Sequence, residues 1–349
     1  MLPAVLPAGR ANGINPNIGA DMISDNEFIQ ARQSVDLLRA RMQYDVMGRD
    51  DVINLVLVAL LADGHVLLED FPGSGKTTLA KALGNSLSSD GVIGQMSAFR
   101  RMQFTPDLLP GDITGVMVFD PDSNQFVFRK GPIFAHIALV DEINRTSPKV
   151  QSALLESMGE KQVTIDNVTH SLTELFFVIA TQNPLDAVGT YPLPIAQLDR
   201  FMFKIRMVSV SREAELKVIK SWGRPRQPCN MPQLTVQHIL AARYAVREGV
   251  ACGDNVMECL VDIIRSIRED PRCLQGASTR SIVQAVPALQ AYAFMQGRNY
   301  VSPQDIQDLA LPLFSHRLQL APGAGQADTV VLENIRQPLE HLSRSAMHR

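Results

Sequence analysis

The sequence predicts an α/β protein in which helices cover both faces of a parallel β-sheet and a small all-α domain follows. Three observations lead to this fold class. Short apolar segments alternate with helical patterns over residues 24–222, which is typical of a parallel sheet buried between helices. The first of these segments leads into a glycine-rich loop and a helix. A proline-rich stretch at 223–232 then separates this region from one that contains only helical patterns.

Two helices are expected ahead of the first strand. Apolar residues recur at helical spacing from about residue 25 to 42, and a second helical pattern covers 51–61. The short segment Val46-Met47-Gly48-Arg49 lies between them.

The first strand, at 66–68, leads into the segment Pro72-Gly73-Ser74-Gly75-Lys76-Thr77-Thr78 and then a helix. This is the strand, glycine loop and helix of a P-loop, a motif that binds phosphate groups. The two glycines allow backbone N–H groups to point into a tight concavity, and the helix adds the positive end of its dipole. Lys76 is expected to reach the outer phosphates of a nucleotide, and the Thr77 hydroxyl is expected to bind Mg²⁺.

Further apolar runs predict the remaining strands of the sheet. They lie at 102–104, 137–140, 175–180 and 201–205. A helix is expected to begin at Ser147-Pro148, because serine is a favoured N-cap and proline is favoured in the first turn.

Two hairpins interrupt this alternation. The first pairs 113–119 with 125–128, and the second pairs 163–165 with 168–170. Their connecting segments, 120–124 and Asp166-Asn167, consist of residue types that favour turns.

The strand at 137–140 ends in the paired carboxylates Asp141 and Glu142. Such a pair at a strand end could instead be a solvated acidic loop, but the P-loop earlier in the chain favours a catalytic role. Asp141 is expected to lie beside Thr77 and to hold Mg²⁺ through water. Glu142 is expected to orient or polarise the water that attacks a nucleotide phosphate.

Four helical patterns follow the proline-rich stretch, at 235–248, 255–268, 279–296 and 303–314. The sequence therefore divides into five expected regions. They are a flexible N-terminal arm at 1–23, an α/β core at 24–222, a linker at 223–232, an all-α domain at 233–318 and a tail at 319–349. The tail is expected to contain one helix that is broken at Pro338.

Composition narrows the class of protein further. Hydrophobic residues make up 46% and charged residues 20%, as in ordinary globular proteins, and the net charge of −3 indicates no bias toward nucleic acid or anionic membranes. The longest apolar run, 55–62, is too short to cross a bilayer, and residues 1–20 lack the pattern of a signal peptide. The four cysteines form no C-x-x-C pair. We therefore expect a cytoplasmic protein with reduced thiols.

With these motifs in place, the chain resembles the MoxR branch of the AAA+ ATPases over residues 46–318. The segments that carry the resemblance are 103–110, 131–134, 141–145, 151–156, 180–184, 191–194, 197–201 and 276–280. Two positions depart from the family pattern, and one departs from the general P-loop pattern. Asp70 replaces a glycine of the P-loop, Ile195 replaces an acidic residue and Thr279 replaces a proline. Neither Ile195 nor Thr279 touches the presumed chemistry, and the remaining P-loop residues match.

The resemblance implies a P-loop AAA+ sheet with a helical lid, ATP and Mg²⁺ as ligands, and roles for further residues. Asn183 would hydrogen-bond the γ-phosphate or the attacking water. Arg200 would reach the nucleotide of a neighbouring subunit as an arginine finger, and Arg280 would contact the γ-phosphate from the lid of its own subunit. Val46 and Gly48 would line the adenine pocket, although packing in the core is an alternative for both.

The resemblance also implies a homo-oligomeric ring, expected to be a hexamer, that remodels or activates a client protein or metalloenzyme complex. A protein with a von Willebrand factor A domain would be its partner, and the two hairpins would face a pore or substrate unless they only complete the sheet edge. Three other functions are open: a magnesium-chelatase-like ATPase subunit, a nucleic-acid motor and a scaffold that binds ATP without hydrolysing it. The net charge of −3 and the 6% aromatic content disfavour nucleic acid. The intact catalytic set disfavours the scaffold.

Overall fold

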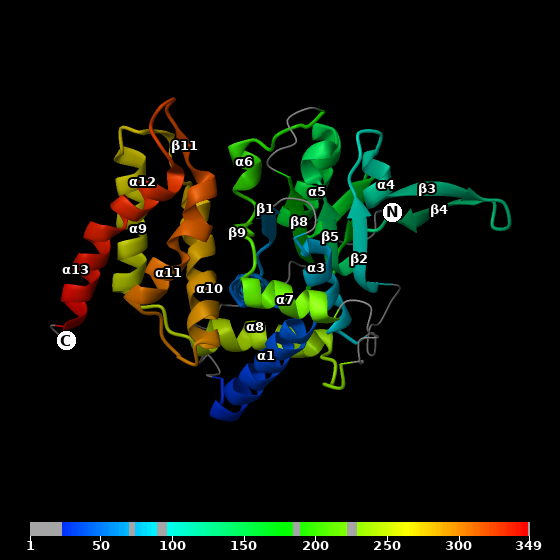
Figure 1. Ribbon diagram of the computed structural model, residues 1–349. Helices are drawn as coiled ribbons and strands as arrows, with labels where there is room; N and C mark the ends of the chain where they lie inside the picture. The colour runs from blue at the N-terminus through cyan, green and yellow to red at the C-terminus, as the bar shows by residue number, and fades with distance from the viewer. Residues whose placement is uncertain (1–22, 70–73, 89–95, 184–188, 222–228, 348–349) are drawn as a thin grey trace, which may run out of the picture.

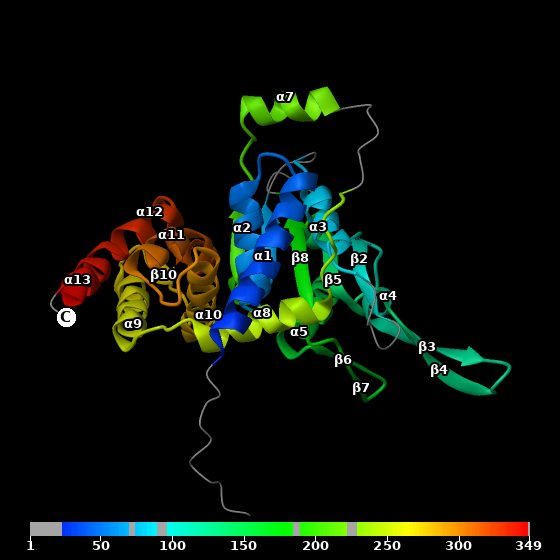
Figure 2. The ribbon, with the colours of Figure 1, turned by 90° about the horizontal axis from the view of Figure 1, so that it is seen from below.

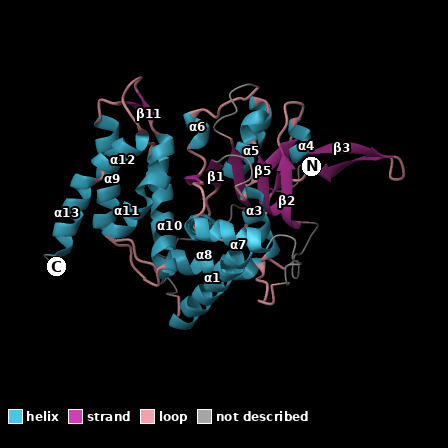
Figure 3. Ribbon diagram, viewed as in Figure 1, coloured by secondary structure: helices cyan, strands magenta, loops and turns pink. Residues whose placement is uncertain are grey.

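A five-stranded parallel sheet forms the centre of the protein, in the strand order β2-β5-β8-β1-β9 (Figure 1). The computed structural model describes residues 23–69, 74–88, 96–183, 189–221 and 229–347. The strands of the sheet are β1 (Val66–Glu69), β2 (Ser97–Gln103), β5 (Ala135–Asp141), β8 (Phe177–Gln182) and β9 (Phe203–Arg206). The predicted fold class is confirmed, because this sheet is parallel and a helical unit follows it (Figure 3).

Both faces of the sheet are buried, because successive side chains of a strand point to opposite sides. On β5, Ile137 and Leu139 join one hydrophobic cluster, whereas Ala138 and Val140 join a second one. The first cluster is covered by α1 (Asp25–Asp45), α2 (Asp50–Leu61) and α3 (Lys76–Asn85), and the second is covered by α5 (Pro148–Glu160). The burial of both faces explains why β1, β5 and β8 are largely apolar.

Three elements differ from the sequence prediction. The strand expected at 102–104 begins at Ser97, because β2 is an edge strand whose exposed arginines hide the apolar pattern. Ile113 was expected in a strand but lies in a short helix, α4 (Pro110–Thr114), where its side chain is buried. The helix α7 (Arg212–Ser221) was not predicted, and nearly all of its side chains are exposed.

Both hairpins form at the predicted places, but neither joins the central sheet. The first consists of β3 (Gly115–Asp120) and β4 (Gln125–Lys130), and the second consists of β6 (Gln162–Ile165) and β7 (Val168–Ser171). The idea that they complete the sheet edge is therefore wrong. The β3–β4 hairpin extends away from the body on the side opposite the helical unit (Figures 1 and 2). Stacking of Phe128 on His170, with ring centroids 4.0 Å apart, joins the two hairpins near their bases.

The helical unit extends beyond the predicted boundary at residue 318. Its elements are α8 (Val236–Gly249), α9 (Asp254–Glu269), β10 (Cys273–Gln275), α10 (Thr279–Met295), α11 (Pro303–Phe314), η2 (Ser315–Arg317), β11 (Gln319–Leu320), α12 (Ala327–Asn334) and α13 (Arg336–Met347). β11 pairs with β10, and α13 packs on α9, so residues after 318 belong to this packed unit. The break between the last two helices lies at Ile335, and Pro338 is accommodated in the first turn of α13, which corrects the expected break.

The remaining domain boundaries stay predictions. Residues 1–22 of the N-terminal arm and most of the linker lie outside the described residues. The helix α8, which we assigned to the lid domain, packs mainly along α1 of the core (Figure 2).

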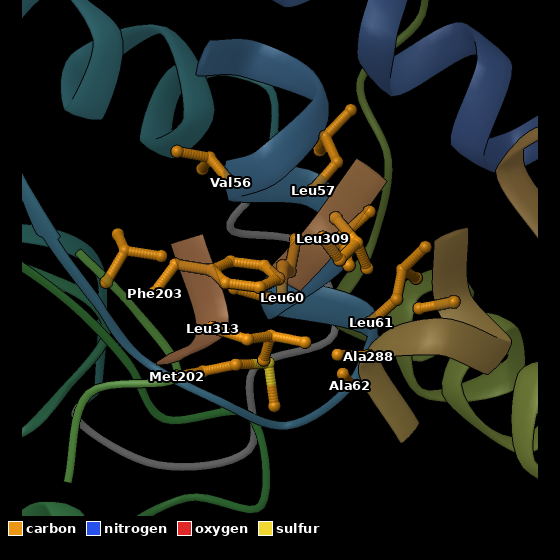
Figure 4. Packing of buried hydrophobic residues seen from close by; sticks show 14 of the residues in the cluster. Val56, Leu57, Leu60, Leu61, Ala62, Met202, Phe203, Ala288, Leu309 and Leu313 are labelled. Atoms are coloured by element: carbon orange, nitrogen blue, oxygen red, sulfur yellow. The ribbon is translucent and has the colours of Figure 1, made fainter. Parts of the chain in front are cut away.

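One continuous hydrophobic cluster joins the core to the helical unit. Leu60 and Leu61 of α2 meet Met202 and Phe203 from the sheet, and helices α10 and α11 contribute further apolar side chains (Figure 4). All four of these side chains are at most 3% exposed. Within the described ranges, none of the helices combines the length and the apolar character that crossing a membrane requires.

Candidate active site

The carboxyl ends of three neighbouring strands bring the predicted catalytic groups to one edge of the sheet. Asp141 ends β5, Asn183 follows β8, and the P-loop follows Glu69 at the end of β1. Strands β5, β8 and β1 are adjacent in the sheet, with a spacing of about 4.8 Å between neighbours. Half-buried Asn183 therefore lies between the acidic pair and the P-loop. Ligands of parallel α/β sheets bind at this edge.

The described part of the P-loop fits an anion. Pro72 and Gly73 lie outside the described residues, and Ser74 begins the visible part. Gly75 is the N-cap of α3 with φ +92°, a left-handed conformation that suits glycine, and open space lies where a Cβ would be. The Ser74 hydroxyl is buried and has no hydrogen-bond partner among the described residues. The first N–H groups of a helix have no acceptor within the helix itself, so together with the start of α3 these features are suited to phosphate oxygens.

The residues after Gly75 lie in the first turn of α3. Lys76 and Thr77 are half-buried, whereas Thr78 is exposed. Behind the loop, the guanidinium of Arg49 donates to the Ser74 carbonyl at 3.2 Å and also to the Val208 carbonyl. Arg49 therefore connects the P-loop to the segment that leads into α7. The sequence analysis gave this arginine no role.

Asp141 is buried and its carboxylate already has two partners. Arg101 of β2 donates to Oδ2 at 2.6 Å, and the Thr181 hydroxyl lies 3.3 Å from Oδ1. Carboxylate and hydroxyl oxygens are the ligands that Mg²⁺ prefers, so Asp141 and Thr77 fit a magnesium site. The side chain of Arg101 is half exposed, so it can move away from the carboxylate when a cation binds there.

Glu142 adopts a left-handed conformation with φ +58°, which is uncommon for a residue other than glycine. Its N–H donates to the Thr181 hydroxyl at 3.0 Å. Its carboxylate accepts from Gln103 Nε2 at 3.0 Å and pairs with Arg145 at 3.2 Å. A strained backbone held by surrounding contacts is common at catalytic residues.

Arg101 and Gln103 are the groups at this edge whose contacts the sequence analysis missed. Gln103 begins one of the segments that carry the family resemblance, but neither residue was given a partner. The two residues are two positions apart on β2. This strand pairs with β5 in a register that puts Gln103 beside Asp141. The register between two strands is set by tertiary packing, so the sequence of β2 alone could not predict it.

The two residues expected near the adenine lie against hydrophobic and helical neighbours. Val46 is buried in the first hydrophobic cluster, and Gly48 has φ +69°. A Cβ at Gly48 would lie only 2.5 Å from the Cβ of Ala214 in α7. Glycine is therefore required here by close packing as well as by the backbone, and the adenine contact stays a prediction.

Arg200 and Arg280 lie close together at the opposite edge of the sheet, where the strands have their amino ends. Arg200 precedes β9 and donates to the Leu155 carbonyl of α5. A Cβ at Gly159, near the end of α5, would lie 3.2 Å from Arg200 Nη1 and 3.9 Å from Arg280 Nη2. The carbonyl of Met158 next to it lies 3.2 Å from His65 Nε2, at the start of β1.

This position argues against the expectation that Arg280 contacts the nucleotide of its own subunit. The helix α5 begins beyond Glu142 at Pro148, and Gly159 is 11 residues farther along it. At 1.5 Å per residue the two ends of that segment are about 16 Å apart, which exceeds the reach of an arginine side chain. In this structure both guanidinium groups therefore lie at the end of α5 that is farther from Glu142.

The fold and the site together define a P-loop ATPase of the AAA+ class. A match to the ATPase family associated with various cellular activities (AAA) covers residues 65–203, and a match to the AAA lid domain covers 265–337. The lid match extends past residue 318, in agreement with the packing of α12 and α13.

Known relatives narrow the class. The chain is 44% identical to YeaC, an uncharacterized protein of Bacillus subtilis, over 86% of this chain and 93% of that protein. It is 37% identical to the chaperone MoxR1 of Mycobacterium tuberculosis, over 79% of this chain and 73% of that protein. A solved structure from Cytophaga hutchinsonii, described as a proposed ATPase, has a TM-score of 0.78 and 33% identity, covering 92% of this chain and 96% of that one.

The chain therefore belongs to the MoxR family of AAA+ ATPases. Membership of this family identifies it as an enzyme that binds nucleotide and hydrolyses ATP.

Proposed function

We propose that this ATPase forms a closed ring, a hexamer by the family pattern, in which each active site is completed by the next subunit. One observation carries the proposal: the P-loop and the acidic pair lie at one edge of the sheet, and both arginines lie at the other. A head-to-tail assembly brings the first edge of one copy against the second edge of its neighbour. The proposed site then contains all the groups that phosphoryl transfer needs.

Within one subunit, the P-loop edge binds and orients the nucleotide. Backbone N–H groups at the start of α3 and the Lys76 ammonium would hold the phosphates. Thr77 and Asp141 would hold Mg²⁺, which neutralises the phosphate oxygens when it is bound. Because Asp141 is paired with Arg101 in this structure, cation binding is expected to displace that guanidinium.

Glu142 is the group that would polarise the attacking water. Its present partners, Gln103 and Arg145, hold the carboxylate at the end of β5, beside the position that Asn183 occupies at the end of β8. Asn183 would hold the water or the γ-phosphate in line. A base and an orienting amide on adjacent strands restrict the water to one direction of attack.

Arg200 and Arg280 would both serve the neighbouring subunit. Two guanidinium groups on a single surface can stabilise the charge of a transferring phosphoryl group, and such arginine fingers accelerate the reaction about 10³–10⁵-fold. The proposal therefore keeps both residues as catalytic groups but moves Arg280 from its own nucleotide to that of the next copy.

We further propose a chaperone-like role in which the ring remodels a client protein or metalloenzyme complex. Two facts support it: a relative is named as a chaperone, and the β3–β4 hairpin carries an exposed apolar strip. Phe119 and Phe126 face each other on this hairpin, 5.4 Å apart, and are 47% and 67% exposed. A partner with a von Willebrand factor A domain and a cytoplasmic location belong to the same proposal.

The test mixes two inactive variants. Lys76→Ala removes phosphate binding but leaves both arginines, and Arg200→Ala removes the finger but leaves the P-loop. Each protein alone is expected to hydrolyse ATP at a small fraction of the wild-type rate. In the mixture, the intact P-loops receive intact arginines, so turnover should rise well above the sum of the two. If mixing produced no rise although the proteins exchange subunits, the shared site would be refuted.

A further inference from the structure

Asp199, the residue before Arg200, belongs to the core and contacts two separate segments of the lid. Its carboxylate accepts hydrogen bonds from Ser278 at 2.9 Å and Ser281 at 3.2 Å, both at the start of α10. It also pairs at 3.5 Å with Arg317 Nε, in the turn that follows α11. Only 15% of the Asp199 side chain is exposed. One carboxylate therefore holds three lid side chains.

Arg317 is almost completely buried, with 1% of its side chain exposed. It donates to the carbonyls of Phe201 at 2.9 Å and Met202 at 3.4 Å, the residues that lead into β9. Burial lowers the pKa of Arg317 to about 10, while the nearby charge of Asp199 opposes that fall. A buried guanidinium is costly to desolvate. Loss of either its ionic partner or its carbonyl acceptors would leave a buried charge without compensation and would be strongly unfavourable.

The residues around this cluster include both proposed catalytic arginines. Arg200 follows Asp199 directly, and Arg280 lies between Ser278 and Ser281 on the first turn of α10. Both guanidinium groups approach Gly159 of α5. Asp199 thus holds the backbone next to both arginines, that of Arg200 in the core and that of Arg280 in the lid.

We infer that Asp199 is a positioning residue that holds Arg200 and Arg280 as a pair for the active site of the next subunit. This inference rests on the proposed function. Asp199 does not touch the nucleotide; it acts by keeping the lid helix α10 and the turn before β9 in one register. Because Arg317 belongs to the lid as well, displacement of the lid would disturb both arginines together.

The test uses the mixing experiment and places Asp199→Asn in one partner at a time. The subunit that supplies arginines carries Lys76→Ala, and the subunit that supplies the P-loop carries Arg200→Ala. Asparagine keeps the size of the side chain but removes its charge. With Asp199→Asn in the arginine-supplying subunit, we expect restored turnover to fall at least tenfold. With Asp199→Asn in the P-loop-supplying subunit, we expect restored turnover to stay within twofold.

The asymmetry separates positioning from general damage. A substitution that only weakened the fold would reduce turnover in whichever subunit carried it, so equal losses in both arrangements would overturn the inference. Full restoration in both arrangements would overturn it as well, while the shared site itself would stand. Failure of the parent mixture, without any change at Asp199, would refute the proposed function instead.

A matched control is available at the other end of α10. Asp305 is a buried lid carboxylate that pairs with Arg298, whose Nη1 lies 2.8 Å away. Asp305→Asn in the arginine-supplying subunit removes a similar ion pair without touching either catalytic arginine, and restored turnover should stay within twofold of the parent.

If Asp199→Asn does not fold, the Ser278→Ala, Ser281→Ala double variant removes two hydroxyl donors and leaves the ion pair intact. It should lower restored turnover at least threefold from the arginine-supplying side alone. An unchanged rate from that side would overturn the inference.

Discussion

The two ends of the parallel strands differ in how their functional groups are brought together. At the carboxyl ends, here called the carboxyl edge, these groups lie in segments that directly follow strands. At the amino ends, the amino edge, they come from both the core and the lid. At the carboxyl edge, short motifs of adjacent residues such as Asp141 and Glu142 carry the chemistry. At the amino edge, Arg200 and Arg280 are 80 positions apart in the chain and meet through contacts around Asp199. In the proposed mechanism, binding of nucleotide is a property of one region, whereas its hydrolysis depends on how the core and the lid pack.

The largest expected effect is that of Arg200→Ala, which separates the roles of the two edges in hydrolysis and in nucleotide binding. Arg200→Ala should lower kcat by about 10³–10⁵, because the developing charge on the transferred phosphoryl group loses its finger. The affinity for ATP should change little, since the P-loop is untouched. Steady-state turnover and equilibrium nucleotide binding measure the two quantities. Arg247→Ala is the control, because that arginine is 72% exposed and its guanidinium contacts Glu248 and the ring of Tyr244, away from both catalytic arginines. A parallel loss of binding would show that Arg200 serves the nucleotide edge of its own chain.

Glu142→Gln tests the carboxyl edge in the same terms. The amide cannot accept a proton from water, so turnover should fall by about 10²–10⁴ while ATP stays bound. The left-handed backbone and the size of the side chain are preserved. Single-turnover hydrolysis of bound ATP distinguishes a chemical defect from slow release of products. Undiminished single-turnover rates would remove Glu142 from the mechanism.

Leu60→Ala tests the joint between core and lid. Leu60 is fully buried among residues of α2, β9 and the lid, and deletion of such a side chain costs about 2–5 kcal/mol of unfolding free energy. Denaturant unfolding monitored by circular dichroism measures this loss. Leu274→Ala, at a leucine that is 64% exposed, should change the free energy by less than about 0.5 kcal/mol. Similar losses for both variants would mean that the joint does not pack as described.

Acid should weaken the amino edge through buried histidines, of which His65 gives the clearest test. Burial lowers the pKa of this ring from 6.5 to about 4, so the unfolded chain binds its proton at a higher pH than the folded chain. The contribution of neutral His65 is fully present above pH 6.5 and is lost between 6.5 and 4, by at most about 1.4 kcal/mol per pH unit. The stability difference between wild type and His65→Gln should therefore shrink from pH 7 to pH 5. A difference that does not vary with pH would contradict this assignment.

The smallest effect concerns the ion pair between Arg101 and Asp141. Arg101→Ala removes the guanidinium that competes for the magnesium-binding carboxylate, so the Mg²⁺ concentration that half-saturates nucleotide binding should fall a few-fold. Arg100→Ala is the neighbouring control, since Arg100 bonds to the Ser97 hydroxyl and lies on the other face of β2. An increase in the Mg²⁺ requirement would indicate that Arg101 helps to build the site.

Most of the fold could be predicted because the buried strands are short and mainly apolar. The strands at β5, β8 and β9, both hairpins and the long helices follow from such patterns. The edge strand β2 and the helix α7 could not be predicted well, because exposed charged residues carry no apolar period. The segment 319–349 was expected to be a tail, and only the packing of α12 and α13 on α9 and α11 shows that these helices complete the lid.

The sequence by itself determined the class of chemistry. A P-loop, an acidic pair and an arginine motif each depend on residues that are neighbours in the chain, so their local geometry follows from a few backbone angles and side-chain types. Only the tertiary structure decided which groups face one another. The pairing of β2 with β5 brings Arg101 to Asp141, and the contacts around Asp199 bring Arg280 to Arg200 at the edge remote from their own P-loop. Such contacts join residues tens of positions apart, and they depend on how whole strands and helices pack, which no local pattern records.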